Sequence, residues 1–335
     1  MKLTDILTQL CQSRGTSGDE GAPIKTAIEL SGLSGRRDTL GNGIVFLGDP
    51  HAKEQVLLDA HMDQVGLIVT GIDEEGFLHI DRCGGADRRV LPGCPVTVFG
   101  KESLFGVIGN LPPHLSDGKS DAVPAITKMT VDLGLPAQKV KSLVTPGDRV
   151  IPQYEPQKLL KSRFASAALD NRAGAAILIR CIHLLKEETL SCGISVLFST
   201  REEIGGQGAV TGSFGLSPTR AICVDVSFGD QPGVREEVSL PLGKGVMIGV
   251  APVLDRSMYQ KLASLADKKN IPYKWDVMGG DTGTNSDAIA TTQGGVHTAL
   301  LSVPLRYMHT ACEVVDTDDL ENAAQLMAAY LREVK

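Results

Sequence analysis

Acidic residues and histidines gather in five short segments of the chain, most of them at the ends of apolar runs. The segments read DAHMD (59–63), LDNRAG (169–174), STREEIGG (199–206), CVDVS (223–227) and RYMHT (306–310). If the apolar runs are strands of an open α/β sheet, these segments lie where such sheets bind ligands, beyond the carboxyl ends of the strands. Imidazoles and carboxylates together bind divalent metals, and a mixed nitrogen and oxygen set suits zinc, cobalt or manganese better than calcium.

Six side chains in these segments are candidates for a single site. They are two histidines and four acids: His61, Asp170, Glu202, Glu203, Asp225 and His309. No nearby surplus of lysine or arginine would neutralise the four carboxylates, and burying uncompensated carboxylates is costly. Each segment alone is weak evidence, because an Asp before a helix is usually an N-cap and a Glu pair is usually solvated. The prediction of a metal site therefore depends on their joint occurrence.

The adjacent acids Glu202 and Glu203 indicate two different tasks at one site. They follow an apolar run at 193–199 that predicts a buried strand, and three glycines stand within the next five residues. Neighbouring side chains on extended or turning backbone point in different directions. Glycine lets the backbone turn tightly, so the two acids can serve one site from different directions.

Strand-like and helix-like segments alternate in two parts of the chain, residues 1–67 and 161–335. The strand candidates are QVLLDAHM (55–62), GISVLFST (193–200), RAICVDVS (220–227) and HTALLSVP (297–304). The helix candidates are residues 170–188, 255–270 and 316–334, the last capped by Asp316 or Thr317. This alternation predicts an α/β domain with a mixed, largely parallel sheet and helices on both faces.

The middle of the chain, residues 68–160, has a different pattern. Short runs of alternating hydrophobicity are separated by EEG, GG, LPG, LPP and TPGD, which are turn signals between strands. One helix-like piece, residues 120–135, interrupts them. We therefore predict a small β-rich domain at 68–160, inserted into a catalytic α/β domain formed by 1–67 and 161–335. His114, in this insertion, is interpreted as structural rather than as a further metal ligand.

Composition excludes several classes of function. The net charge of −7 over 335 residues argues against nucleic acid or an anionic membrane as a partner. No run of 18 apolar residues is present, and the first 15 residues predict an amphipathic helix rather than a signal peptide. The seven cysteines are scattered and include no CxxC pair, which indicates a reducing, cytoplasmic location.

In their order and on this architecture, the acids and histidines resemble the M42 family of metallo-aminopeptidases, which includes glutamyl aminopeptidases and tetrahedral archaeal aminopeptidases. The resemblance covers essentially the whole chain and implies a zinc-peptidase-like fold. The matching motifs are HMDQVG (61–66), GDRV (147–150), LDNRAG (169–174), REEIGGQGA (201–209), LGKG (242–245) and PLRYMHT (304–310).

The resemblance implies two divalent metal ions per subunit, zinc or cobalt, with manganese as a further candidate. His61, Asp170 and Asp225 would hold the first ion. Asp170, Glu203 and His309 would hold the second, so that Asp170 bridges the two. A carboxylate has two oxygens, so one can serve each ion of a two-metal site.

The resemblance also implies roles for residues around the ions. Glu202 would be the general base, taking a proton from the water that the two metals activate and then donating it to the leaving amine. Asp63 would accept the N–H of His61 that faces away from the metal and so fix its tautomer. The peptide bond Asp170–Asn171 would be cis, as it is in the family.

The function that this resemblance implies is removal of N-terminal residues from peptides. Family members form large homo-oligomers, often dodecamers arranged as a tetrahedron, with the inserted domain making contacts. Three positions depart from the usual family pattern: Gln64 stands for Glu, Asn285 for Asp and Thr310 for Ser. Gln64 is neither ligand nor base in the resemblance, and Asn285 falls in a region expected to line the substrate pocket.

Two alternatives remain open on the sequence. Another dinuclear metallohydrolase, such as a carboxypeptidase or an N-acyl deacetylase, would bind a substrate carboxylate and require a dedicated arginine. Arg172, Arg201 and Arg306 lie near the motifs but also have structural interpretations. A protein of another class, an assembly or binding protein without metal, is disfavoured by the intact ligand set and by Glu202.

Overall fold

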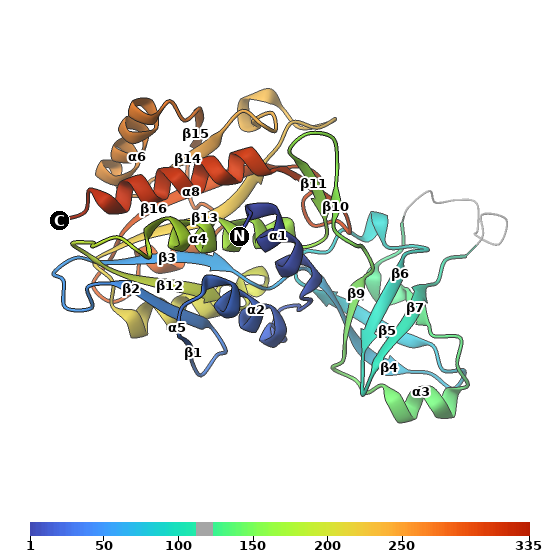
Figure 1. The fold of residues 1–335 in the computed structure, drawn as a ribbon. Helices are drawn as coiled ribbons and strands as arrows, with labels where there is room; N and C mark the ends of the chain where they lie inside the picture. Colours follow the sequence, from blue (N-terminus) through green and yellow to red (C-terminus); the bar gives the residue numbers. More distant parts are fainter. Residues whose placement is uncertain (112–122) are drawn as a thin grey trace. The chain divides into compact units, whose positions relative to one another are not determined.

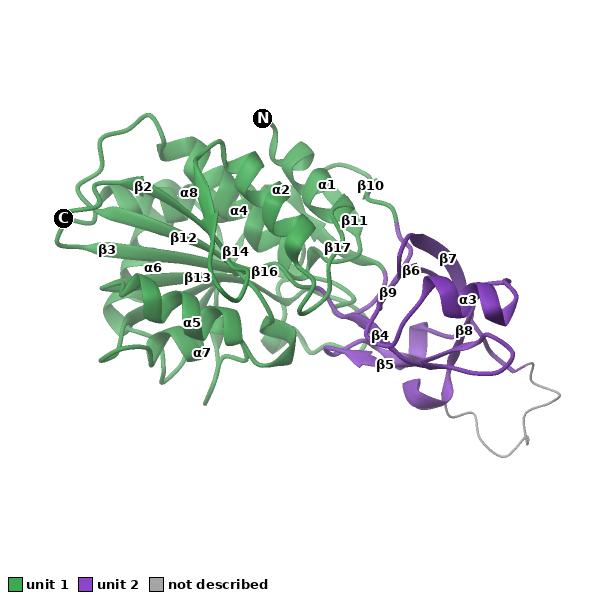
Figure 2. Cartoon of the chain, turned by 90° about the horizontal axis from the view of Figure 1, so that it is seen from below, with its two compact units in different colours: residues 1–63, 155–308, 312–335 green, residues 64–154, 309–311 purple. Residues whose placement is uncertain are grey.

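The computed structural model describes residues 1–111 and 123–335, which form two compact units (Figure 2). Unit 1 comprises residues 1–63, 155–308 and 312–335, and unit 2 comprises residues 64–154 and 309–311. The units divide after Asp63 and after Tyr154, whereas the sequence prediction set these junctions a few residues later, after 67 and after 160.

A mixed sheet forms the centre of unit 1, in the strand order β1-β2-β12-β3-β13-β16-β14-β15. The four neighbours β12, β3, β13 and β16 are parallel. Strand β2 runs antiparallel to both β1 and β12, while β14 runs antiparallel to β16 and parallel to β15. The strands are β1 (Gly35–Arg37), β2 (Gly43–Gly48), β3 (Gln55–His61), β12 (Gly193–Ser199), β13 (Arg220–Phe228), β14 (Val246–Val250), β15 (Tyr273–Val277) and β16 (His297–Leu305). The predicted mixed α/β class is confirmed.

Helices cover both faces of this sheet (Figure 1). Five of them share the larger apolar core on one face: α1 (Leu3–Gln12), α2 (Gly21–Ser31), α4 (Leu169–Leu185), α6 (Arg256–Lys269) and α8 (Thr317–Arg332). The other face carries α5 (Gln207–Leu216) and α7 (Asn285–Ala290). Helix α1 forms because Leu3, Ile6, Leu7 and Leu10 fall on one stripe, and all four are buried. Asp316 caps α8, since its side chain accepts from the N–H of Asp318.

Smaller elements complete unit 1. An antiparallel sheet has the order β10-β11-β17, with β10 at Gln157–Lys158, β11 at Arg163–Ser166 and β17 at Glu313–Asp316. Single 3₁₀ turns are η4 (Glu202–Ile204), directly after β12, and η5 (Glu236–Val238). No helix within residues 1–111 and 123–335 is long and apolar enough to cross a membrane.

Unit 2 is a closed barrel in the strand order β4-β5-β8-β7-β6-β9. Its elements are β4 (Gly66–Ile72), β5 (Leu78–Cys83), η1 (Arg88–Val90), β6 (Pro95–Phe99), β7 (Ser103–Ile108), η3 (Ile126–Lys128), β8 (Thr130–Asp132), α3 (Ala137–Leu143) and β9 (Arg149–Pro152). Inward side chains alternate along the strands and fill the interior, among them Leu67, Val69, Leu78, Ile80, Val96 and Val98.

The helix predicted at 120–135 is wrong in its described part. Residues 126–128 form one 3₁₀ turn and residues 130–132 form β8, which pairs with β5 and β7. Met129 and Val131 are buried in the barrel and Leu133 packs against the same core. Their spacing of two is that of a strand, and it outweighs the weaker helical spacing of the same apolar residues.

Candidate metal centre

The predicted ligands of unit 1 lie at one edge of the central sheet. His61 is the last residue of β3, Asp225 lies near the end of β13, and Glu202 and Glu203 open η4 after β12. These three strands are parallel neighbours, so their carboxyl ends meet at the same edge. Asp170 reaches this edge from the first turn of α4.

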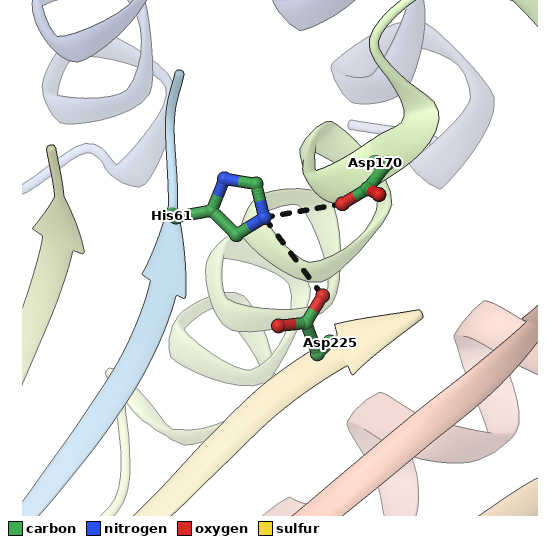
Figure 3. A group of neighbouring side chains, drawn as sticks. All are labelled: His61, Asp170 and Asp225. Carbon is green, nitrogen blue, oxygen red and sulfur yellow. Dashed lines mark hydrogen bonds and ion pairs between the residues drawn. The ribbon is translucent and has the colours of Figure 1, made fainter. Parts of the chain in front are cut away.

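The two ring nitrogens of His61 face different groups. Nε2 lies 3.1 Å from Oδ1 of Asp170 and 3.9 Å from Oδ1 of Asp225 (Figure 3). It is also 3.9 Å from Oε2 of Glu202. On the other side, Nδ1 lies 3.1 Å from the backbone oxygen of Asp63 and 3.3 Å from its Oδ1. Nδ1 therefore carries a hydrogen that it donates to Asp63, and Nε2 is directed toward the other carboxylates.

The electrostatics of this group favour a cation. Burial lowers the pKa of His61, but the carboxylates of Asp170 and Asp63 outweigh that effect and hold it well above its usual value. Burial raises the pKa of Asp225 well above its usual value, and His61 opposes the shift while Asp170 and Glu202 add to it. His61 and Asp225 therefore hold protons when no metal is bound, because several buried carboxylates lie close to one another.

The geometry suits a divalent metal. One ligand atom from each of His61, Asp170 and Asp225 lies within 4.8 Å of the others, and the same holds for His61, Glu202 and Glu203. Nitrogen and carboxylate oxygen are the donors that zinc, cobalt and manganese accept. A divalent ion would offset the buried negative charge that the described residues leave around Nε2 of His61.

Asp63 anchors both His61 and the backbone of the Glu pair. Its Oδ1 accepts from the N–H of Glu202 at 3.0 Å, and its Oδ2 accepts from the N–H of Glu203 at 3.1 Å and from the hydroxyl of Ser17 at 2.6 Å. Burial raises the pKa of Asp63, but its partners, His61 foremost, bring it below its usual value. The contact with His61 is the one expected from the sequence, whereas the contacts with the Glu pair are additional.

The Glu pair stands on a tight turn. Arg201 has a left-handed φ of 59°, and Gly205 and Gly206 have φ of 121° and 72°. The N–H of Gly206 donates to the carbonyl of Arg201 and that of Gly205 to the carbonyl of Glu202, which closes the turn. The glycines are required here because L-residues rarely adopt these φ values. The side chain of Glu202 is 17% exposed, so it is accessible at the edge of the group.

The start of α4 is held by contacts that position Asp170. The Asp170–Asn171 peptide bond is cis, as the resemblance implied. The side chain of Asn171 donates to the carbonyl of Val224 in β13 at 2.7 Å and accepts from the N–H of Gly174 at 3.0 Å. A Cβ at position 174 would lie 2.2 Å from Oδ1 of Asn171, so the site requires glycine. Both residues belong to the motif LDNRAG, but the sequence does not indicate these contacts.

Glu313 supports Asp170 from β17. Its Oε2 accepts from the backbone N–H of Asp170 at 3.0 Å, and the residue is 2% exposed. Sequence reasoning missed this residue. A single glutamate beside a short apolar run has no pattern that would have indicated a partner 143 positions away.

His309 belongs to unit 2, and its role as a ligand stays a prediction. Within that unit its Nδ1 lies 3.2 Å from the backbone oxygen of Gly85, to which it donates. A Cβ at position 85 would lie 2.7 Å from Nδ1, so glycine is needed to admit the ring. With Nδ1 donating to Gly85, Nε2 is the nitrogen that the predicted ligand role of His309 would use.

A second polar layer lies beneath His61. The side-chain amide of Asn285 donates to Oδ2 of Asp59 at 3.0 Å and to the hydroxyl of Ser199 at 2.9 Å. Burial raises the pKa of Asp59 to about 6, against the hydrogen bonds from Ser199 and Asn285. Asn285 is 3% exposed, so its side chain is enclosed and supports β3. The expectation that the region around it lines the substrate pocket stays a prediction.

Other residues singled out in the sequence have structural positions. Arg172 is fully buried and donates to the carbonyls of Leu10 and Ser13, and Arg306 donates to the backbone and side chain of Asp230. Cys223 is buried, which raises the pKa of its thiol well above the usual value and keeps it neutral. His114 lies outside the described residues.

Comparison with known proteins gives consistent matches over nearly the whole chain. The model of a family described as M42 glutamyl aminopeptidase matches residues 41–326. The lysyl aminopeptidase of Pyrococcus furiosus is 31% identical over 340 residues, covering 99% of this chain and 97% of the relative. A solved aminopeptidase from the archaeon Desulfurococcus kamchatkensis is 30% identical, with a TM-score of 0.92 over 99% of this chain and 95% of the other. The Pyrococcus horikoshii TET1 peptidase, described as assembling into a tetrahedron or a large octahedral shell, is 31% identical, with a TM-score of 0.89 over 99% of this chain and 100% of the other.

Proposed function

The chain belongs to the M42 family of glutamyl aminopeptidases, and on that premise we propose that it is a metal-dependent aminopeptidase that hydrolyses the N-terminal bond of peptides. The observation that carries the proposal is the group of buried carboxylates around Nε2 of His61. Such a group, on the sheet edge where α/β folds bind ligands, is typical of a metal-dependent hydrolytic site.

We assign the predicted ligands to two ions, zinc or cobalt, with manganese as the further candidate. His61, Asp170 and Asp225 would hold the first, and Asp170, Glu203 and His309 the second. The grouping of the first three ligand atoms within 4.8 Å supports the first site. When bound, the two ions would polarise the scissile carbonyl and lower the pKa of water toward neutrality.

Glu202 is the proposed general base. Its carboxylate lies beside His61 and is partly accessible, and its backbone is fixed by Asp63. From that position it would take a proton from the attacking water and donate it to the nitrogen of the leaving amine. Asp63 contributes by orienting His61 and by holding the turn that carries Glu202 and Glu203.

The charge of the site favours a substrate with a free amino terminus. Four carboxylates of unit 1, those of Asp170, Glu202, Glu203 and Asp225, gather at the same sheet edge. With two divalent ions bound, these four negative charges would balance the charge of the ions, so the site would tolerate a terminal amine, and the second ion would accept its neutral nitrogen. An acetylated terminus offers no basic nitrogen to either. A site built to pair with a polar group discriminates against a substrate that lacks it, by as much as about 10⁴-fold.

The arginines bear on the alternative of a carboxypeptidase or deacylase. Arg172 is enclosed in the core and Arg306 is paired with Asp230, so these two guanidinium groups are not positioned to receive a substrate carboxylate, which leaves Arg201 alone of the three candidates. We therefore favour the aminopeptidase, and the proposal includes peptide substrates, a homo-oligomer and a cytoplasmic location. The seven cysteines, which form no disulfide in the described residues, support a reducing compartment.

Two matched peptides test the proposal. One has a free N-terminus and the other is its N-acetylated twin, and each is incubated with enzyme loaded with zinc, cobalt or manganese. Mass spectrometry should show the first peptide shortened one residue at a time from its N-terminus and the second intact, with no cleavage after chelation. Equal cleavage of both peptides, or trimming from the carboxyl end, would favour the alternative. Light scattering at micromolar concentration tests the homo-oligomer, and a monomer would contradict it.

A further inference from the structure

The loop between α1 and α2, residues 13–20, contacts the turn that carries the Glu pair. The hydroxyl of Ser17 donates to Oδ2 of Asp63 at 2.6 Å. The carboxylate of Glu20 accepts from the backbone N–H of Arg201 at 3.0 Å. The loop thus contributes one contact to the carboxylate beneath the turn and one contact to the turn itself.

Three consecutive N–H groups of the turn end on carboxylates. That of Arg201 donates to Glu20, and those of Glu202 and Glu203 donate to the two oxygens of Asp63. N–H groups that donate to carboxylates form stronger bonds than those that donate to neutral acceptors. The backbone from which both acidic side chains project is therefore held at three successive positions.

The loop is itself rigidly supported. The buried guanidinium of Arg172 donates to the carbonyls of Leu10 and Ser13, which fixes the point where the loop leaves α1. A Cβ at Gly15 would lie 2.5 Å from the carbonyl oxygen of Asp19, so the loop closes tightly on itself. Ser17 is 1% exposed and Glu20 is 4% exposed. The two side chains therefore act from within the protein interior and not from the solvent.

Placing a second buried carboxylate beside Asp63 has an electrostatic cost, because like charges repel and burial removes hydration. The hydrogen bonds that the carboxylate of Glu20 accepts from the N–H groups of Gly18 and Arg201 offset that cost. Arg201 has a left-handed φ of 59°, so the turn bends sharply at the residue that Glu20 holds. An acceptor at this point fixes where the turn begins and hence where Glu202 and Glu203 project.

We propose that Ser17 and Glu20 are positioning residues for hydrolysis, which fix the geometry of Glu202 and Glu203 without touching substrate or metal. The inference rests on the proposed function for its catalytic part. Reacting groups must be held within fractions of an ångström, and the partners of catalytic and ligand residues supply that constraint.

Three variants and one matched control test the proposal. Ser17→Ala and Glu20→Ala remove the contacts, and Glu20→Gln retains an acceptor oxygen. Ser31→Ala is the control, because Ser31 is also buried in the N-terminal segment. Among the described residues its hydroxyl bonds only to neighbouring backbone, the carbonyl of Ile28 and the N–H of Leu33. Each variant is measured for kcat and KM on a free peptide, for zinc affinity by competition with a chelator, and for Tm.

We expect Ser17→Ala and Glu20→Ala to lower kcat about tenfold or more with little change in KM, in the range found for partners of ligand residues. Zinc affinity should fall by a similar factor, because Glu203 stands on the same turn. Glu20→Gln should recover most of both losses. Ser31→Ala should lower Tm to a similar extent as Ser17→Ala while leaving kcat and zinc affinity unchanged.

The outcomes separate this inference from the proposed function. If Ser17→Ala and Glu20→Ala match Ser31→Ala in kcat and zinc affinity, the positioning role is overturned while the aminopeptidase stands. If the wild type does not cleave the peptide, the proposed function fails, and zinc affinity still decides whether the loop positions the turn. A Ser17→Thr variant, which retains the hydroxyl, should bind zinc as the wild type does, and a loss equal to that of Ser17→Ala would count against the inference.

Discussion

Asp63 holds His61 from the side opposite the other carboxylates, with Nδ1 of the ring 3.1 Å from the backbone oxygen of Asp63 and 3.3 Å from its Oδ1. The ring therefore has one orientation, with Nε2 presented toward Asp170 and Asp225, and Nδ1 keeps its hydrogen when a metal displaces the proton on Nε2. The same carboxylate accepts from the backbone of both residues of the Glu pair. One buried aspartate thus fixes the positions of both a proposed ligand, His61, and the proposed base, Glu202.

Asp63→Asn should weaken zinc binding and activity together. The amide keeps one acceptor oxygen, but its NH₂ group cannot accept from His61, Ser17 or the backbone of the Glu pair. Loss of such a partner typically costs 10- to 100-fold in metal affinity or activity. Zinc content after dialysis and kcat/KM on a free peptide measure the two effects. Wild-type zinc content with lost activity would contradict a role of Asp63 in placing His61 and Glu203, and would leave Glu202 as the residue that it positions.

Glu202 and Glu203 should respond differently to substitution. Glu202→Gln keeps the side-chain size and removes the base, so metal content should remain and kcat should fall by about 10²- to 10⁴-fold. Glu203→Ala removes a proposed ligand, so one metal per subunit should be lost as well. Metal analysis of the purified variants beside their kcat values decides between these roles. Equal metal loss in both would contradict the assignment.

Gly85→Ala should disturb His309 while leaving the rest of the barrel folded. The added Cβ would lie 2.7 Å from Nδ1 of His309, so the ring must move. Gly109→Ala is the matched control, because Gly109 lies in the same unit and a Cβ added there would meet no atom of residues 1–111 and 123–335 closer than 3.6 Å. We expect Gly85→Ala to lose one metal per subunit with most of the activity, and Gly109→Ala to behave as the wild type. Full metal content in Gly85→Ala would count against His309 as a ligand.

Metal affinity should rise with pH. Burial lowers the pKa of His61, but Asp170 and Asp63 hold it well above its usual value, and burial raises the pKa of Asp225. Both groups must lose their protons to bind a metal, so binding releases protons and becomes stronger as the pH increases. The gain is up to about tenfold per pH unit for each proton released. Calorimetry of zinc binding at several pH values, in buffers of different ionisation enthalpy, counts these protons, and no release would contradict the protonated metal-free site.

The sequence predicts the sheet edge and its candidate ligands because both have local patterns. Apolar runs of strand length end in acids or histidines at His61, Glu202 and Asp225, so the strands and the side chains beyond them are visible together. The barrel of unit 2 shows the limit of such patterns. Met129 and Val131 belong to a stretch whose apolar spacing admits a helix or a strand, and only pairing with β5 and β7 makes it a strand.

The supporting residues of the site could not be predicted from the sequence. Ser17 meets Asp63 from 46 positions away, and Glu313 meets Asp170 from 143 positions away. A lone Ser or Glu in a polar segment has no periodicity that indicates a buried partner. Gly85 is one of two successive glycines in what appears in the sequence as an ordinary turn. Its steric task depends on His309, which reaches it only in the folded unit.

Asn285 and Asp59 form a buried donor–acceptor pair. The resembling family usually has Asp at position 285, and substituting Asn285 tests what this difference does. The amide of Asn285 donates to Asp59 at 3.0 Å, and both residues are almost fully buried. Asn285→Asp would place two carboxylates in contact and remove the amide donor between them. A buried charge that loses its partner typically costs about 3–5 kcal/mol of folding stability.

The pH dependence of this loss distinguishes charge repulsion from a packing defect. Burial already raises the pKa of Asp59 from 3.8 to about 6. A raised pKa means that the folded state binds the proton more tightly, so the wild type loses this contribution as the pH rises from about 4 through 6. Asn285→Asp should extend the loss to higher pH, because a second carboxylate must also stay protonated. Tm should therefore be near that of the wild type at pH 5 and far below it at pH 8.

The double variant Asp59→Asn with Asn285→Asp restores one donor and one acceptor, and it should recover most of the Tm at pH 8. Equal destabilisation at both pH values, or no recovery in the double variant, would show that shape rather than charge determines this position.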